Sequence, residues 1–269
     1  MMGQLKQVNK KLAASEKLKS EFLSNIRNEI INPFASIMGF ATRLMELRPE
    51  EGEKARQIGR LIHSEAFDLD FQLRNIFAAA EIEAGQVTCQ IAQVDLYQLT
   101  TSVIKDYQPG AMQNDLSLEL SFLPDASSPL MNFTGDADKI ATCTANLLSN
   151  AVNFASSGSK VKLLVHRFDD TLQINVTNQG QTISEEDREK VFDRFVQLDT
   201  GMTKARPGHG LGLTVTRALA ELMNGQVQLH TSTPCETVFV LTIPQLRAEG
   251  NMDLSPEANE LFFSDDILL

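Results

Sequence analysis

Residues 146–151 read Asn-Leu-Leu-Ser-Asn-Ala, and residues 208–213 read Gly-His-Gly-Leu-Gly-Leu. On a helix, Asn146 and Asn150 are four residues apart and share one face, where their carbonyl oxygens could hold a hydrated Mg²⁺ that carries nucleotide phosphates. Glycines at a helix start let backbone N–H groups approach phosphate oxygens closely. Each motif alone is a weak signal, because asparagines often cap helices and glycines often end loops. Together, in this order, they predict a nucleotide-phosphate site.

Mixed helix and strand patterns surround these motifs between residues 91 and 247. Helical periodicity covers residues 96–112, 136–155 and 211–223, and alternating apolar residues predict strands at 116–123, 160–168, 172–177, 226–231 and 237–243. This order predicts an α/β sandwich, with helices against one sheet. Residues 248–269 are acidic and contain no basic residue, so we expect a flexible tail or a docking peptide there.

The first 90 residues show the pattern of two long helices, with a heptad-like entry at residues 5–12. Apolar residues recur at steps of three and four on both sides of segment 48–52, whose proline and glycine predict a turn. The second apolar stripe is Ile58, Ile62, Ala66, Leu69, Leu73, Ile76 and Ala80. A second copy that completes a four-helix bundle would cover the apolar flanks of this hairpin. We therefore predict an α+β fold and a homodimer, with an antiparallel pair packed on its own domain as the alternative.

Composition narrows the classes of partner. The net charge of −11 opposes nucleic-acid binding, because phosphate contacts need clustered Lys and Arg. No apolar run approaches the roughly 20 residues that span a bilayer, so membrane contact is expected only through a segment upstream of this chain. Cys89, Cys143 and Cys235 are odd in number and widely spaced. This spacing favours reduced thiols in the cytoplasm over disulfides or a zinc site.

Three further stretches accompany the two motifs. Residues 22–33 read Phe-Leu-Ser-Asn-Ile-Arg-Asn-Glu-Ile-Ile-Asn-Pro, residues 176–180 read Val-Thr-Asn-Gln-Gly, and residues 191–195 read Val-Phe-Asp-Arg-Phe. In this order, residues 5–245 resemble the core of two-component sensor histidine kinases, whose ATP-binding domain is related to gyrase and a heat-shock chaperone. The resemblance implies a dimerisation and phosphoacceptor-like hairpin at 1–90, an ATP-binding domain at 91–247 and a tail at 248–269. It further implies ATP and Mg²⁺ as ligands, and a response-regulator receiver domain or another histidine kinase as partner.

The resemblance places the family's phospho-accepting histidine at position 28, where this chain has Asn28, followed by Glu29 as the family's base. Position 28 lies midway between Ile26 and Ile30 of the apolar stripe, so on a helix it faces outward. The lone pair of an amide nitrogen is delocalised, whereas neutral imidazole is a nucleophile. We therefore expect no autophosphorylation at Asn28, and His63 on the second helix is a minor alternative acceptor.

By the same resemblance, the nucleotide is bound by Asn146, Asn150, Asn153, Asn178, Gly180, Arg194, Gly208, Gly210 and Gly212, with Asn150 at the metal. Asn153 stands where a phosphate-contacting lysine is common, Asn178 where an aspartate accepts from the adenine amine, and Thr182 where a second glycine is usual. A hydrogen bond to a charged group contributes about 1.5–3 kcal/mol, against about 1 kcal/mol for a neutral one. We expect ATP binding to be weakened and catalysis to be weakened further, with Arg194 as a partial compensation.

Three functions remain open. The first, which we favour, is a pseudokinase: a dimeric scaffold that binds a receiver domain or another kinase without phosphoryl transfer. The second is a receiver phosphatase in which Asn32, one helical turn after Asn28, orients the attacking water, although Asn32 also reads simply as a polar residue before a proline. The third is an active kinase with an engineered change at Asn28, which the further changes at Asn153 and Asn178 oppose.

Overall fold

The computed structural model describes residues 30–124, 131–193, 196, 210–233 and 236–246. The chain forms two compact units, with the division between Glu83 and Ala84. No helix within these residues combines the length and apolarity that crossing a membrane requires.

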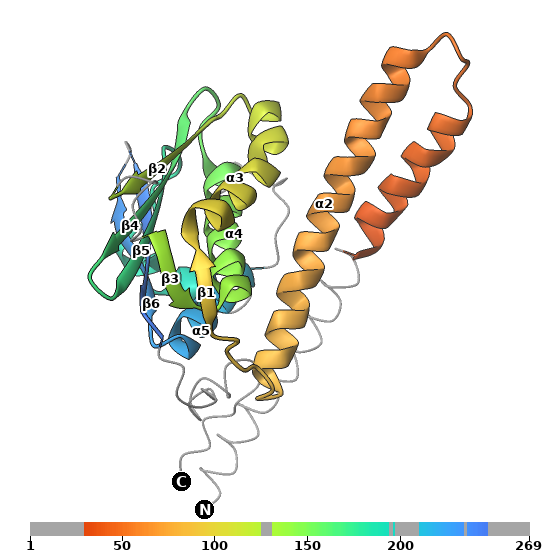
Figure 1. Ribbon diagram of the computed structural model, residues 1–269. Coiled ribbons are helices and arrows are strands. Elements are labelled where there is room, and N and C mark those ends of the chain that lie inside the picture. Colours follow the sequence, from red (N-terminus) through yellow and green to blue (C-terminus); the bar gives the residue numbers. More distant parts are fainter. Residues whose placement is uncertain (1–29, 125–130, 194–195, 197–209, 234–235, 247–269) are drawn as a thin grey trace, which may run out of the picture. The chain divides into compact units, whose positions relative to one another are not determined.

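The first unit is a helical hairpin. Residues 30–45 form one helix, and α2 (Gly52–Glu83) runs back beside it (Figure 1). The Glu51 carboxylate holds the turn, because it accepts a hydrogen bond from the Arg48 backbone N–H at 3.1 Å and pairs with the Lys54 ammonium at 2.5 Å. The predicted break at residues 48–52 is therefore confirmed.

The buried face of α2 differs from the predicted apolar stripe at two alanines. Ile58 is buried as predicted, but Ala66 and Ala80 are exposed. The buried positions toward the end of α2 are Gln72, Asn75, Ala79 and Ile82. A helix gains most by burying its larger apolar side chains, so the isoleucine at 82, rather than Ala80, lies on the buried face. Asn75 is carried inward with it, and its amide donates to the Phe71 carbonyl at 3.2 Å.

Large apolar side chains remain exposed on the helix of residues 30–45. Ile31, Phe34 and Met38 are exposed by 53%, 58% and 54%. Such side chains are the flanks that a second copy would cover in a four-helix bundle. The homodimer itself stays a prediction, since the structure is that of a single chain.

A five-stranded sheet forms the base of the second unit. The strand order is β2-β4-β5-β7-β6, with β2 parallel to β4 and the other neighbours antiparallel. The strands are β2 (Ser117–Leu123), β4 (Lys160–Phe168), β5 (Thr171–Asn178), β6 (Gln226–Ser232) and β7 (Thr237–Pro244). All five predicted strands are thus confirmed to within about one residue at each end.

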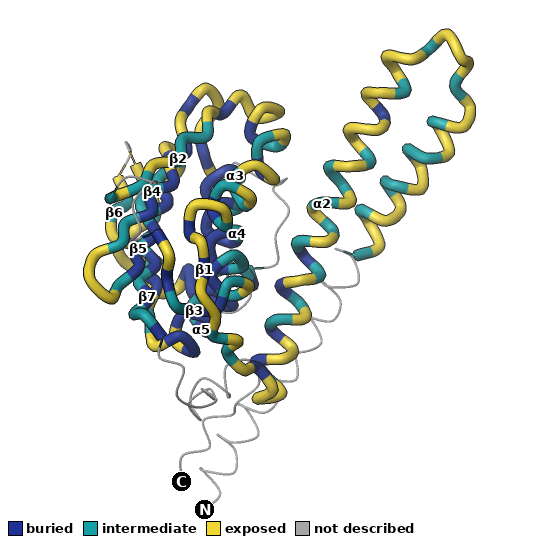
Figure 2. The backbone as a smooth tube through the Cα atoms, viewed as in Figure 1, coloured by how far each residue is buried: buried dark blue, intermediate teal, exposed yellow. Residues whose placement is uncertain are grey.

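Three helices cover one face of this sheet (Figure 1): α3 (Leu96–Gln113), α4 (Ala137–Phe154) and α5 (Gly212–Leu222). The strands alternate accordingly between buried and less buried positions (Figure 2). On β5 the residues Leu172, Ile174 and Val176 are fully buried. Helix α4 packs against both α3 and α5 and also contacts β4 and β5. The predicted α/β sandwich is confirmed, and α4 lies at its centre.

A second, small sheet was not predicted from the sequence. Strands β1 (Ala92–Asp95) and β3 (Asn132–Gly135) pair antiparallel over four residues each. Segments this short carry little alternation, and their pairing joins residues far apart in the chain. Strand β1 leads directly into α3, because the Asp95 carboxylate caps that helix by accepting from the Gln98 N–H at 3.0 Å.

Candidate functional site

Asp136 positions the start of α4. The residue is 2% exposed, and one carboxylate oxygen caps the helix by accepting from the Lys139 backbone N–H at 3.0 Å. The other oxygen pairs with the Lys139 ammonium at 2.8 Å and accepts from the Gln90 backbone N–H at 2.7 Å. A capping aspartate is a common helix start. Here it also ties the segment before β1 to the helix that carries the predicted asparagines.

Asn146 lies in the interior face of α4 and is 3% exposed. Neither its side-chain oxygen nor its side-chain nitrogen has a hydrogen-bond partner among the described residues. Buried amides of native proteins are normally paired, and leaving one unpaired costs about 1–3 kcal/mol. This unpaired amide is therefore the clearest sign that a group from outside the described residues completes the site.

The start of α5 lies against this amide. A methyl group placed on Gly212 would lie 3.5 Å from the Asn146 side-chain oxygen. Gly210 has a φ of 66°, which is the left-handed region that glycine adopts without strain. The Thr214 hydroxyl donates to the Phe192 carbonyl at 3.0 Å and so fixes the first turn of α5. The N–H groups at this helix start suit an anion. The structure brings the two motifs together at Asn146 and Gly212.

The end of β5 is joined closely to the end of α4. A methyl group on Gly180 would lie 2.0 Å from the Phe154 backbone oxygen, so only glycine fits there. Next to it, the Ser156 N–H donates to the Gln179 carbonyl at 2.7 Å. Asn178, the last residue of β5, is 3% exposed. The structure therefore places Asn178 and Gly180 beside the carboxyl end of α4.

A group of hydroxyls that sequence reasoning missed supports this end of β5. Thr237 faces Asn178 directly across β5 and β7 and is 3% exposed. Its hydroxyl lies 3.3 Å from that of Ser232 and donates to the Gln181 carbonyl at 3.5 Å, while Ser232 accepts from the Ile183 N–H at 2.7 Å. No motif signals these residues, because only the strand pairing brings them together. The loop after Gly180 is thereby tied to the β6–β7 pair.

Asn150 and Asn153 lie further along α4 and are half-buried. The Asn153 amide nitrogen lies 3.4 Å from the Ser149 hydroxyl, which is one turn earlier on the helix. Asn150 follows Asn146 by four residues, so both asparagines project from the same side of α4. Their roles toward metal and phosphate stay predictions.

Four of the predicted site residues, Asn28, Glu29, Arg194 and Gly208, lie outside the described residues. Asn32 is described, and it is exposed on the helix of residues 30–45. It belongs to the first unit, whereas the asparagines of α4 belong to the second. Thr182, where the resemblance expects glycine, is exposed on the loop after Gly180.

The described cysteines are free thiols. Cys143 is fully buried on α4, where burial raises its pKa well above the usual range, and its sulfur lies 3.8 Å from the Thr216 carbonyl. Burial also raises the pKa of Cys89, whose sulfur lies 3.8 Å from the Leu222 carbonyl. Cys235 lies outside the described residues. In the part of the chain that the structure describes, no group of three or more His, Cys, Asp or Glu side chains could hold a metal ion.

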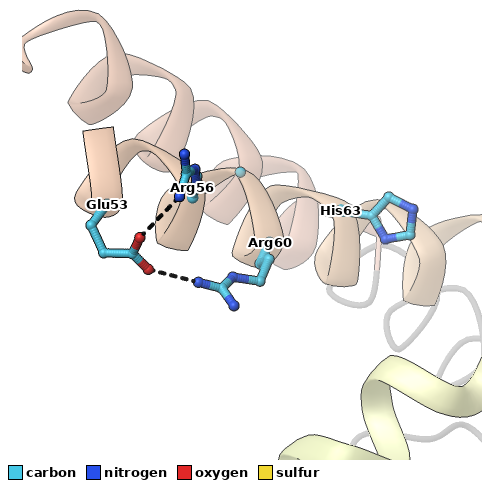
Figure 3. Close-up of a pocket in the computed structure, with 5 residues that line it drawn as sticks. Glu53, Arg56, Arg60 and His63 are labelled. Carbon is cyan, nitrogen blue, oxygen red and sulfur yellow. Dashed lines mark hydrogen bonds and ion pairs between the residues drawn. The ribbon is translucent and has the colours of Figure 1, made fainter. Parts of the chain in front are cut away.

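A separate shallow hollow lies on α2 and is lined by Glu53, Arg56, Gly59, Arg60 and His63 (Figure 3). The Glu53 carboxylate pairs with Arg56 at 3.5 Å and with Arg60 at 3.2 Å. These side chains are exposed, and exposed ion pairs of this kind contribute little. With its charge partly cancelled and no buried polar group, this surface has the character of a solvated helix face.

Residues 135–247 match the family described as histidine kinase-, DNA gyrase B-, and HSP90-like ATPase. The circadian input-output histidine kinase CikA of Synechococcus elongatus is 29% identical over 235 residues, which cover 86% of this chain and 31% of CikA. The sensor-like histidine kinase SenX3 of Mycobacterium bovis is 26% identical over 245 residues, which cover 91% of this chain and 58% of SenX3. The chain thus spans less than two thirds of each of these relatives.

Solved structures show the same fold. Full-length ShkA in complex with AMPPNP aligns with a TM-score of 0.59 at 21% identity, over 90% of this chain and 47% of ShkA. Histidine kinase AdeS of Acinetobacter baumannii aligns with a TM-score of 0.56 at 18% identity, over 82% of this chain and 98% of AdeS. Histidine kinase ThkA, in complex with the response regulator protein TrrA, aligns with a TM-score of 0.54 at 19% identity, over 92% of this chain and 67% of that chain.

Proposed function

This chain carries the core of a two-component histidine kinase, and from that premise we propose that it is a pseudokinase, a nucleotide-binding signalling scaffold that does not phosphorylate itself. The observation that carries the proposal is Asn28 in the stretch of residues 22–33. Phosphorylation of the side chain at position 28, as at the family's histidine, needs a nucleophilic nitrogen with a free lone pair. The amide of Asn28 has none, and Glu29 beside it cannot create one by accepting a proton.

The second unit supports nucleotide binding. The unpaired amide of Asn146 faces the glycine-rich start of α5, which suits phosphate oxygens. Asn150, on the same side of α4, would hold a hydrated Mg²⁺, which when bound neutralises phosphate charge. ShkA, which shares the fold, was solved with AMPPNP. We therefore assign ATP with Mg²⁺ to the surface between α4, the end of β5 and the start of α5.

Two neutral side chains weaken the site. Asn153 offers an amide where the family commonly has a lysine, and Asn178 offers an amide where the family has an aspartate. Loss of one charge-assisted hydrogen bond corresponds to about tenfold in affinity. Loss of a cation near the terminal phosphates acts mainly on transition-state charge. Binding consequently survives better than catalysis, and this pair of changes favours a natural pseudokinase over an engineered change at Asn28 alone.

The partner surface lies on the first unit. The exposed apolar side chains Phe34 and Met38 suit a second copy of this chain in a four-helix bundle. ThkA, which shares the fold, was solved with a response regulator protein, and a receiver domain is the partner that we assign to the exposed face of the helix of residues 30–45 around Asn32. The free thiols of Cys89 and Cys143 suit a reducing compartment such as the cytoplasm.

Calorimetric titration of the natural chain with Mg²⁺ and AMPPNP tests nucleotide binding. We expect binding that Asn150→Ala weakens by about tenfold or more, because the metal loses a ligand. The matched control is Asn114→Ala, which removes an exposed asparagine at the end of α3 and should leave the affinity unchanged. Absence of binding by the natural chain would leave interaction alone as its function. Autophosphorylation of the natural chain at position 28 would contradict the pseudokinase assignment directly.

A specific observation favours a second activity, dephosphorylation of a receiver domain. Asn32 is exposed on the helix of residues 30–45, so its amide can orient a water molecule toward a docked phosphoryl group without an imidazole. Release of phosphate from a phosphorylated receiver domain should fall in Asn32→Ala and persist in Asn28→Ala. Undiminished turnover by Asn32→Ala would rule this activity out.

A further inference from the structure

One face of the five-stranded sheet is left uncovered. Helices α3, α4 and α5 pack against the other face, and no described helix lies on this one (Figure 1). Successive side chains of a strand point to opposite sides of a sheet, and on β4 the inward residues Val161, Leu163 and Val165 are fully buried. The outward residues of this strand, which we call the β4 column, are Lys160, Lys162, Leu164, His166 and Phe168.

The uncovered face is positive in a chain whose net charge is −11. The charged residues that the five strands place on this face are Lys160, Lys162 and Glu119, and the Glu119 carboxylate pairs with the Lys160 ammonium. Lys162 lies opposite Glu119 in the register of β2 and β4, so two ammonium groups share one carboxylate. One positive charge therefore remains to attract an acidic group from elsewhere.

The same face carries exposed apolar side chains and an unpaired polar atom. Leu123 and Phe168 are exposed by 52% and 41% at one end of the face, where the rings of His166 and Phe168 lie 4.9 Å apart. Asn175 lies opposite Leu164 of the β4 column, and its buried side-chain oxygen has no hydrogen-bond partner among the described residues. A segment with acidic groups, apolar side chains and free backbone N–H groups would complement all of these features.

A segment of this composition follows β7 in the chain. Residues 248–259 lie outside the described residues and contain no basic residue. Their acids are Glu249, Asp253 and Glu257, and their larger apolar residues are Met252 and Leu254. This stretch is the first half of the acidic tail, for which the sequence predicts either a flexible tail or a docking peptide.

The described chain ends next to the β4 column. The Gln245 N–H donates to the Asp170 carbonyl at 2.6 Å, in the turn directly after Phe168. The eleven residues that follow Leu246, up to Glu257, can span about 36 Å, whereas β4 extends over about 26 Å. The segment can therefore reach either end of the column. Because a short tether gives an effective concentration of about millimolar or more, individually weak contacts are enough to hold it there.

We propose that the uncovered sheet face is a docking surface for the acidic segment of residues 248–259 of the same chain. The segment lies along the β4 column, with Asp253 and Glu257 toward Lys162 and with Leu254 over the apolar side chains. This inference is independent of nucleotide binding, since none of the residues involved belongs to the proposed nucleotide site.

A single fluorescent probe in the full chain tests the proposal. The chain has no tryptophan, so Leu254→Trp supplies the only one. Quenching by acrylamide should be several-fold weaker in this protein than in a free peptide of residues 248–259 with the same replacement, because docking shields the ring. Lys162→Glu should raise the quenching toward the value of the peptide. Reversing the acids as well, with Asp253→Lys and Glu257→Lys, should restore the shielding.

The matched control is Lys105→Glu, the same charge reversal at an exposed position of α3, which should leave the quenching unchanged. An equal effect of Lys105→Glu and Lys162→Glu would overturn the proposal, because it would reflect net charge alone. Failure of the charge swap to restore shielding in a folded protein would do the same. Shielding that increases with protein concentration would assign the segment to a second copy and refute docking within one chain.

The probe decides the matter even where a variant fails to fold. Quenching of Leu254→Trp that equals that of the free peptide, with Lys162 in place, overturns the docking surface. Circular dichroism of each variant shows whether the sheet is intact, so that a loss of shielding is read only from folded proteins.

Discussion

Replacing Asp136 by asparagine should destabilise the second unit far more than the loss of one surface charge would. Asparagine keeps the side-chain oxygen that caps α4, so the helix start survives. The second carboxylate oxygen becomes an NH₂ group that faces two donors, the Gln90 N–H at 2.7 Å and the Lys139 ammonium at 2.8 Å. The Lys139 side chain is only 15% exposed. Its charge is left largely without water and without its partner.

The magnitude follows from these contacts. A hydrogen bond to a charged group contributes about 1.5–3 kcal/mol, and breaking a buried ion pair from one side costs about 3–5 kcal/mol. The two terms share one oxygen atom and do not add, so we expect a loss of about 3 kcal/mol in the free energy of unfolding. Asp136→Ala also removes the cap and should cost about 1 kcal/mol more. Adding Lys139→Met to Asp136→Asn should recover part of the loss, because it removes the stranded charge.

Urea unfolding measures these values, followed by circular dichroism and by the exposure of Cys143 to a thiol reagent. Cys143 is fully buried in the second unit, so its modification reports the unfolding of that unit. The control is Asp138→Asn, an exposed acid in the first turn of the same helix, which should cost at most about 1 kcal/mol through the helix dipole. A loss below about 1 kcal/mol in Asp136→Asn, or no recovery on adding Lys139→Met, would refute the reasoning.

Further predictions concern packing, thiol chemistry and assembly. Gly180→Ala should lower the stability of the second unit by about 1–3 kcal/mol and reduce nucleotide affinity, because the new methyl group meets a backbone oxygen at 2.0 Å. The control Gly110→Ala, whose methyl group meets nothing within 4 Å, should raise helix stability. Thermal unfolding compares the stabilities of the two variants, and calorimetry compares their nucleotide affinities. In the folded protein, peptide mapping after thiol labelling should find Cys89 modified faster than Cys143, since Cys89 is only partly buried. Equal rates of modification at the two thiols would show that α4 readily exposes Cys143 to solvent. Phe34→Glu should shift a dimer toward monomer in sedimentation experiments, because it places a charge on the exposed apolar flank; an unchanged dimer would place the interface elsewhere.

Several site features could be predicted because they are local. Asn146 and Asn150 share a helix face by spacing alone, and the glycines at 210 and 212 mark a helix start. The Asn28 substitution is visible in the motif of residues 22–33, and its chemical consequence follows from the amide group. The hydroxyls of Ser232 and Thr237, by contrast, are marked by no sequence motif. These residues join the site only because β7 pairs with β5 on one side and with β6 on the other.

The sequence by itself determined the helical hairpin, the five strands, the three covering helices and the order of the nucleotide motifs, since hydrophobic periodicity and turn residues act over a few residues. Only the tertiary structure decided that β1 pairs with β3, that the Asp136 carboxylate holds the Gln90 N–H, and that the α2 stripe turns toward Asn75 and Ile82. These features depend on contacts between segments distant in the chain, where the burial of one group sets the position of another. The unpaired amide of Asn146 is a further feature of this kind. The position of Asn146 on its helix follows from local spacing, but only the folded core leaves its amide without a described hydrogen-bond partner.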